Sequence, residues 1–149
     1  PLEEEKMSTL RQPYRELSAE VNKQMVAALM ALEKGPLDGR LIELVFLRVS
    51  QINGCAYCLE MHSNTLRKRG EDQARLDALA GWRVSQRFSE KEQAALAWAE
   101  AVTHIAESGA GDEVYHPLEQ HFSPQEISDL THAIALMNAF NRLAVGMRM

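Results

Sequence analysis

The sequence contains few cysteines, no long hydrophobic run and no excess of basic residues, and each absence excludes a class of protein. A chain of 149 residues with only two cysteines is long enough to bury a core without disulfide or metal staples. No apolar run approaches the roughly 20 residues of a membrane-spanning helix. The formal net charge of -5 and the pI of about 5.5 argue against a general affinity for nucleic acid, whose phosphates need a basic face. We therefore expect neither a membrane nor a nucleic-acid partner.

Strand signals are also scarce, whereas helical periodicity extends along most of the chain. No Asn-Gly or Asp-Gly pair lies between alternating apolar runs, which is the usual hairpin signal. The content of 46% hydrophobic and 25% charged residues is typical of a soluble globular protein. We predict a single all-α domain over residues 1–149, a bundle of about six to seven helices with a helical extension over residues 1–35.

Apolar spacing and capping residues place the individual helices. In residues 17–36, apolar side chains recur at three- and four-residue intervals until Gly35 and Pro36 end the pattern. Residues 41–47 are apolar nearly all round, as expected for a buried central helix that ends at Asn53-Gly54. Further helices are predicted from the cysteines to Gly70, at 89–109 and 123–146, where a serine opens a capping box, and, shorter, at 72–81 and 112–121.

The first residues, PLEEEKMSTLRQPYRE, are acidic and polar rather than a basic segment followed by an apolar one. Nothing in them indicates export, so a cytoplasmic protein is expected. In that reducing compartment a cysteine pair is seldom a structural staple and is more often catalytic or metal-binding.

The two cysteines lie in NGCAYCLEMHSNTLRKRG, residues 53–70. On a helix that begins near Cys55, this residue, Cys58 and His62 fall along one face. Cys58 and His62 are four residues apart, close enough for the imidazole to share a hydrogen bond with the sulfur. A thiol near a helix N-terminus also feels its positive end, which lowers the thiol pKa and favours the thiolate. Both effects act on Cys58, which is the better candidate nucleophile.

A metal site is the alternative, because two cysteines and a histidine are common zinc ligands. Along a continuous helix, however, about 10.5 Å of rise separates Cys55 from His62. No second cysteine-rich element completes a ligand set, and Leu59 rather than histidine follows Cys58, so the haem-attachment pattern fails. The other histidines are scattered and are expected to be surface or core residues: His104, His116, His121 and His132. A redox dithiol is therefore favoured, with no metal and no cofactor.

Glu43 is the only polar residue in LIELVFL, residues 41–47. A carboxylate in such a buried helix has its charged form disfavoured, which suits it to work as an acid or base near neutral pH. Two plainer alternatives stay open: Glu43 pairs with a buried arginine such as Arg48 or Arg142, or it lies on an exposed edge of the helix.

Together these residues resemble the core of the AhpD-like alkylhydroperoxidases, within the carboxymuconolactone decarboxylase superfamily. Glu43 is followed after eleven residues by Cys55-x-x-Cys58 and, after three more, by His62. The stretch INGCAYCLEMH is close to the usual sequence of this region in that family, and ALMNAFNRLAV is similar to the sequence of its last helix. The first 35 residues contribute little to the resemblance.

The resemblance implies an all-α fold and a thiol-dependent peroxidase of antioxidant defence. In such enzymes the second cysteine, here Cys58, attacks a hydroperoxide as thiolate, and the first, here Cys55, captures the sulfenic acid as a disulfide. An external dithiol, such as a lipoyl-bearing or thioredoxin-like partner, then reduces the disulfide. Glu43 and His62 would relay protons. Family members are commonly trimers or hexamers, so a homo-oligomer is expected.

One residue departs from the family pattern: Tyr57 stands where the best-characterised members carry a second histidine between the cysteines. Tyrosine is a poor base at pH 7, so a shorter proton relay or a slower peroxidase is expected. The departure motivates a second hypothesis, a non-enzymatic dithiol redox sensor or binding protein. A third is a decarboxylase or isomerase like the superfamily members that act on a lactone. Those members need no redox dithiol, so the intact pair argues against this third activity.

Several other polar and aromatic residues are assigned structural roles. Asn138, Asn141 and Arg142 interrupt an apolar helix and are expected to form a polar network across the core or to reach Glu43. The bulky aromatic residues expected in the core or at an interface are Trp82, Phe88 and Trp98.

Overall fold

The computed structural model describes residues 9–149, which fold into a helical bundle without a strand. The predicted all-α fold is confirmed. Over these residues, six helices are at least six residues long and three more are single turns of four residues. The longer helices are α2 (Ala19–Glu33), α3 (Gly39–Asn53), α4 (Ala56–Lys68), α5 (Gln73–Ala78), α6 (Glu90–Thr103) and α9 (Pro124–Met147). The shorter elements are α1 (Tyr14–Leu17), α7 (Ile105–Ser108), α8 (Asp112–Tyr115) and the 3-10 helices η1 (Leu79–Val84) and η2 (His116–Gln120). Within this described range, none of the helices has the length and hydropathy that crossing a bilayer requires.

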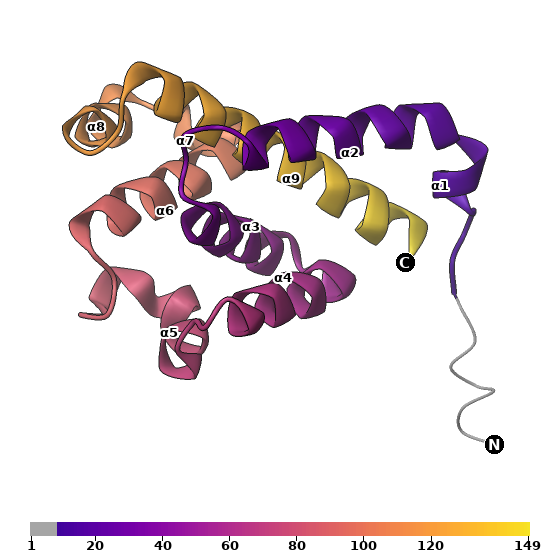
Figure 1. Cartoon of the computed structure of the whole chain (residues 1–149), viewed down its shortest axis with the longest axis horizontal. Coiled ribbons are helices and arrows are strands. Elements are labelled where there is room, and N and C mark those ends of the chain that lie inside the picture. The colour runs from indigo at the N-terminus through magenta and orange to yellow at the C-terminus, as the bar shows by residue number, and fades with distance from the viewer. Residues whose placement is uncertain (1–8) are drawn as a thin grey trace.

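α3 is the central helix of the bundle and positions the candidate site. It packs against α4 on one side and against α6 and α9 on the other (Figure 1). Its apolar run is buried all round as predicted, because every residue from 41 to 47 is buried. At its start the Asp38 side chain accepts a hydrogen bond from the Leu41 N–H (3.3 Å). Gly54 ends the helix with a φ of 66°, a left-handed conformation that glycine adopts without steric cost.

The hydrophobic core lies on both sides of α3. One cluster joins α3 to α6 and α9, and a smaller one joins α3 to α4, α5 and η1. Trp82, Trp98 and Phe88 are at most 7% exposed, which confirms their structural role. Each indole N–H is satisfied, since Trp82 donates to Glu100 (2.9 Å) and Trp98 donates to Thr131 (3.0 Å).

Some segments predicted as single helices are interrupted. The helix over 89–109 breaks at His104, whose φ of -98° and ψ of 35° lie outside the helical region. The Ser108 hydroxyl then donates to the Ala101 carbonyl, which an unbroken helix would pair with a backbone N–H. Two shorter segments pass from an α-helix into a 3-10 helix: 72–81 and 112–121.

α2 lies at an outer edge of the bundle, where α9 and α1 are its main contacts (Figure 1). Apolar spacing predicted this helix, but Leu32 is its only buried residue, and Val21 and Met30 are 61% and 51% exposed. The segment before α2 lies against the end of α9, since the Arg11 N–H donates to the Met147 carbonyl (2.8 Å). α2 is therefore attached to the bundle along a narrow face.

Glu100 of α6 connects this helix to α3 and η1 through side-chain hydrogen bonds. Its carboxylate accepts hydrogen bonds from Arg48 of α3 (3.0 Å) and from Trp82 (2.9 Å) and Arg83 (2.8 Å) of η1. Partial burial raises the pKa of Glu100, but the hydrogen bonds from Trp82, Arg83 and Arg48 outweigh it and hold the pKa below its usual value. A carboxylate with a depressed folded-state pKa stabilises the fold above its unfolded-state pKa. That stabilisation is lost as the pH falls through the folded-state pKa.

We therefore expect the free energy of unfolding to decrease as the pH falls below about 4.5. Glu100→Gln should be less stable than the wild type at neutral pH and should lose less stability on acidification, because the amide does not titrate. Urea denaturation at a series of pH values measures both effects. Glu60→Gln, an exposed carboxylate of α4, is the matched control. Identical pH dependence in Glu100→Gln and the wild type would contradict the prediction.

Candidate active site

The cysteine pair lies at the junction of α3 and α4. Cys55 caps α4 in an extended conformation (φ -87°, ψ 97°), and its sulfur accepts a hydrogen bond from the Cys58 N–H at 3.3 Å. α4 therefore begins at the cysteines, as predicted, and Cys58 lies within its first turn. The backbone N–H groups of a first turn stabilise negative charge on a nearby sulfur.

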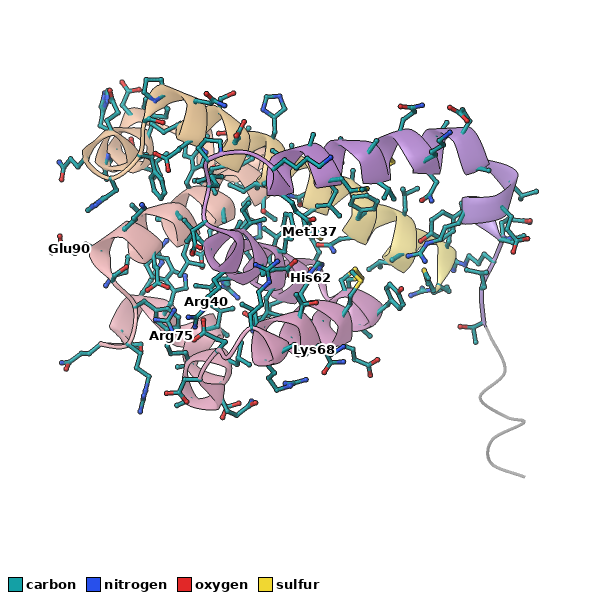
Figure 2. All side chains as sticks on the ribbon, viewed as in Figure 1. Arg40, His62, Lys68, Arg75, Glu90 and Met137 are labelled. Carbon is teal, nitrogen blue, oxygen red and sulfur yellow. A yellow bond between two sulfur atoms is a disulfide. The ribbon has the colours of Figure 1, made fainter. Side chains whose placement is uncertain are left out.

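The two sulfurs are joined in a disulfide, with the Cα atoms of Cys55 and Cys58 5.3 Å apart. Figure 2 shows the yellow bond between them near the start of α4. Both cysteines are at most 3% exposed, and Tyr57 and Ala144 of α9 pack beside them. A pair held this close by one helical turn can pass between dithiol and disulfide without a change in distant parts of the chain.

Glu43 and His62 form a buried pair that links α3 to α4. His62 Nδ1 and Glu43 Oε2 are 2.8 Å apart, and both side chains are at most 10% exposed. The alternatives left open by the sequence are resolved, because Glu43 is buried and pairs with neither arginine. Arg48 binds Glu100 instead, and Arg142 is exposed. A Glu43 carboxylate accepts its hydrogen bond from Nδ1–H, which places the basic lone pair of the imidazole on Nε2.

The other ring nitrogen of His62 has no partner. Within the described part of the chain, Nε2 is the only buried side-chain nitrogen or oxygen without a hydrogen bond. The hydrogen bond expected between the imidazole and the Cys58 sulfur is not formed in this disulfide state, in which the sulfur has no proton to donate. Glu43 and the Phe46 ring, whose centroid is 5.3 Å from that of His62, hold the imidazole in place. A buried unpaired nitrogen costs stability, and a ligand that bonds to it would offset that cost.

A pocket of about 240 Å³ adjoins the disulfide and the imidazole. Cys58 and His62 belong to this wall, whereas Cys55 does not. The remaining walls come from α1, α2 and α9 and are mainly apolar, with Leu29 and Phe140 among them. Of the two cysteines, Cys58 is therefore the one that adjoins the pocket.

Arg15 reaches the same pocket from α1, and nothing in the sequence predicted this. Its guanidinium carbon lies 5.2 Å from the centroid of the Tyr57 ring, and both side chains line the pocket. Partial burial lowers the pKa of Arg15, but the neighbouring hydroxyls of Tyr57 and Tyr14 raise it above its usual value. Tyr57, the residue that departs from the family pattern, thus stacks with a permanent cation. No motif or periodicity connects position 15 with the distant cysteines.

An amide network holds the turn between α3 and α4. Asn53 Nδ2 donates to the side-chain oxygens of Asn138 (2.9 Å) and Asn141 (3.0 Å) on α9. Asn141 in turn donates to the Ser50 hydroxyl (3.1 Å). The predicted polar network is confirmed for the two asparagines of α9, but exposed Arg142 does not belong to it. The network connects the last turn of α3 to α9 and so fixes the position from which α4 begins.

Replacing Asn141 by alanine should lower the free energy of unfolding by about 2 to 3 kcal/mol, because Asn53 and Ser50 would lose a buried partner. Urea denaturation followed by circular dichroism measures the loss. Asn64→Ala, at an exposed position of α4, is the control and should change stability by less than about 0.5 kcal/mol. Equal stability of the two variants would show that the network contributes nothing.

The histidines considered as further metal ligands do not gather at the site. Across residues 9–149, no group of three or more His, Cys, Asp or Glu side chains is placed to hold a metal ion. His104, His116 and His132 are exposed and His121 is partly exposed, so they are surface residues.

Comparisons with known proteins relate this arrangement to one family. Residues 18–101 match the sequence model of the carboxymuconolactone decarboxylase family. The chain is 34% identical over 137 residues to the uncharacterized protein YdfG of Bacillus subtilis, a match that covers 92% of this chain and 93% of YdfG. A stretch of 30 residues is 63% identical to alkyl hydroperoxide reductase AhpD of Rhodococcus erythropolis, and it spans 20% of this chain and 17% of that protein.

A solved structure supports the same relationship over nearly the whole chain. It is that of a protein of unknown function from Agrobacterium tumefaciens, described as a candidate antioxidant defence protein AhpD. The two chains are 40% identical and superpose with a TM-score of 0.91, over 94% of this chain and 96% of the other. The predicted AhpD-like fold is therefore confirmed.

Proposed function

The chain belongs to the carboxymuconolactone decarboxylase family, and from this premise and its site we propose that it is a thiol-dependent peroxidase. It reduces hydroperoxides through the dithiol of Cys55 and Cys58 and serves antioxidant defence. A cytoplasmic setting belongs to the proposal, because thiols and the dithiols that regenerate them stay reduced there.

One observation carries the proposal: of the two cysteines, Cys58 is the one that lines the pocket. A hydroperoxide in the pocket can approach Cys58 while Cys55 stays behind it. Cys58 also lies in the first turn of α4, where the backbone N–H groups favour a thiolate. These positions support attack by Cys58 and resolution by Cys55.

The oxidising half of the cycle consumes the hydroperoxide. His62 Nε2 takes the proton of the Cys58 thiol, and the thiolate attacks the terminal peroxide oxygen. The O–O bond breaks, the alkoxide receives the proton back from the imidazole, and an alcohol and a sulfenic acid result. The Cys55 thiol then attacks the sulfur of the sulfenic acid. The displaced hydroxide takes the thiol proton and leaves as water, and the disulfide forms.

Glu43 supports this proton transfer through its contact with the other ring nitrogen of His62, Nδ1. Its carboxylate, 2.8 Å from Nδ1, keeps the proton of the neutral imidazole on Nδ1 and stabilises the imidazolium that forms when Nε2 is protonated. His62 lines the pocket together with Cys58 and its Nε2 is buried without a partner, so the relay proposed here needs no solvent molecule to carry the proton. Tyr57 has no part in this shorter relay.

The reducing half of the cycle uses an external dithiol. One of its thiolates attacks the sulfur of Cys58, the cysteine that lines the pocket, and Cys55 leaves as a thiolate that the Cys58 N–H stabilises at 3.3 Å. The second thiol of the reductant then displaces Cys58 and forms the reductant's own disulfide. In sum, one hydroperoxide and one dithiol become one alcohol, one water and one disulfide. We propose a lipoyl-bearing or thioredoxin-like protein as this partner.

The proposal includes a homo-oligomer, a trimer or hexamer, as the family resemblance implies. The exposed apolar side chains of α2, Val21 and Met30 among them, support contact with another copy of the chain.

Multiple turnover tests the proposed function. The protein is mixed with an excess of an alkyl hydroperoxide and an excess of a small dithiol, and peroxide loss is followed over time. A peroxidase consumes many equivalents of hydroperoxide per chain. Consumption that stops after one equivalent would indicate a redox sensor and overturn the proposal.

A further inference from the structure

The pocket contains one permanently charged side chain. Of the twelve described residues that line it, Arg15 is the only arginine, lysine, aspartate or glutamate. The chain as a whole carries a net charge of -5, so this cation contrasts with the rest of the molecule. A cation on an otherwise apolar wall attracts an anion into the pocket.

No described residue supplies an anion to Arg15. Among the ion pairs of residues 9–149, none involves Arg15. Its guanidinium stacks over the Tyr57 ring, 5.2 Å from the centroid, and lies beside the hydroxyls of Tyr57 and Tyr14, which occupy only part of its five N–H groups. Those groups form a planar fork that matches the two oxygens of a carboxylate. Arg15 is therefore oriented by Tyr57 and still able to pair with a ligand.

The rest of the pocket suits a hydrocarbon chain. Val26 and Leu29 of α2 face the pocket, as do Met137 and Phe140 of α9. Apolar walls of this kind bind an alkyl chain by removing its surface from water. Cys58 lies on the same wall, so a molecule anchored at Arg15 can present a reactive group to the sulfur.

We propose that the pocket recognises an anionic amphiphile, whose carboxylate pairs with Arg15 and whose apolar chain extends along α2 and α9. The inference rests on the proposed function, because both reactants of that cycle could carry this chemistry. The carboxylate could belong to the oxidant, as a fatty-acid hydroperoxide, or to the reductant, as a dithiol carboxylic acid.

Two matched pairs of substrates distinguish these sources. A fatty-acid hydroperoxide is compared with its methyl ester, and dihydrolipoate is compared with dihydrolipoamide. In at least one pair, kcat/KM for the acid should exceed that for the neutral compound by about fivefold to tenfold. In Arg15→Gln the ratio should fall to about one, and in Arg15→Lys it should be intermediate, because lysine keeps the charge and loses the fork. Lys23→Gln removes an exposed cation of α2 outside the pocket and should keep the full ratio.

A binding measurement separates this inference from the proposed function. Titration calorimetry with the disulfide form should show octanoate binding more tightly than octanamide, with a difference that decreases as salt screens the exposed guanidinium and vanishes in Arg15→Gln. Turnover of all four substrates without any acid preference, or an acid preference that survives in Arg15→Gln, would overturn the inference and leave the peroxidase standing. Octanoate binding that depends on Arg15, with no turnover of any substrate, would support the anion site and overturn the peroxidase.

Discussion

Replacing Cys58 by serine is expected to lower the rate of hydroperoxide consumption by about a thousandfold or more, because a serine hydroxyl cannot act as the thiolate nucleophile. Cys58 is the cysteine that lines the pocket, so Cys55 is not expected to take its place. The measurement is peroxide loss in the presence of excess dithiol, with the folded state of the variant checked by circular dichroism.

Cys55→Ser is the matched comparison, because it removes the other sulfur of the same disulfide. It should lose multiple turnover but still consume one equivalent of hydroperoxide, leaving Cys58 as a sulfenic acid that dimedone traps and mass spectrometry detects. Cys58→Ser should give no such adduct. If Cys58→Ser kept the wild-type rate, or if the trapped sulfenic acid lay on Cys55, the assignment of the two sulfurs would be wrong.

Replacing His62 by asparagine is expected to lower kcat/KM for the hydroperoxide by about a hundredfold, the usual contribution of a general acid or base. The asparagine amide nitrogen takes the place of Nδ1 and can still donate to Glu43, whereas nothing replaces Nε2. The variant therefore removes the proton-transfer atom and keeps the buried carboxylate paired. Initial rates of peroxide loss over a range of hydroperoxide concentrations measure this decrease in kcat/KM.

Glu43→Gln provides the second arm of this test. The glutamine carbonyl can still accept the hydrogen bond from Nδ1–H, but it carries no charge to stabilise an imidazolium. Its effect should be about tenfold, smaller than that of His62→Asn. Because Glu43 acts through His62, the double variant should be little worse than His62→Asn alone. Additive effects of the two changes would show that the residues act independently.

The candidate catalytic residues were predicted from local spacing and one resemblance. Cys55, Cys58 and His62 lie within three turns of one helix, so their common face follows from helical geometry. The burial of Glu43 followed from the apolar run on both sides of it. Its partner could not be predicted, because the bond to His62 depends on how α3 and α4 cross.

Other features of the site had no signal in the sequence at all. Arg15 belongs to a single turn within the predicted helical extension, and it reaches the pocket because the segment before α2 lies against the end of α9. The breaks in the predicted helices are of the same kind. Near His104 the Ser108 hydroxyl donates to the Ala101 carbonyl in place of a backbone N–H. Apolar periodicity does not predict such a side-chain hydrogen bond.

The sequence by itself determined the all-helical class, most ends of the long helices and the placing of two thiols and an imidazole on one helix face. These features depend on residues close together in the chain, where the backbone geometry is nearly the same in every helix. The tertiary structure alone decided that Glu43 pairs with His62 and that Cys58 rather than Cys55 lines the pocket. It also decided that Arg15 places a positive charge on the pocket wall. Each of those contacts joins elements distant in sequence, and side-chain packing between helices selects such contacts.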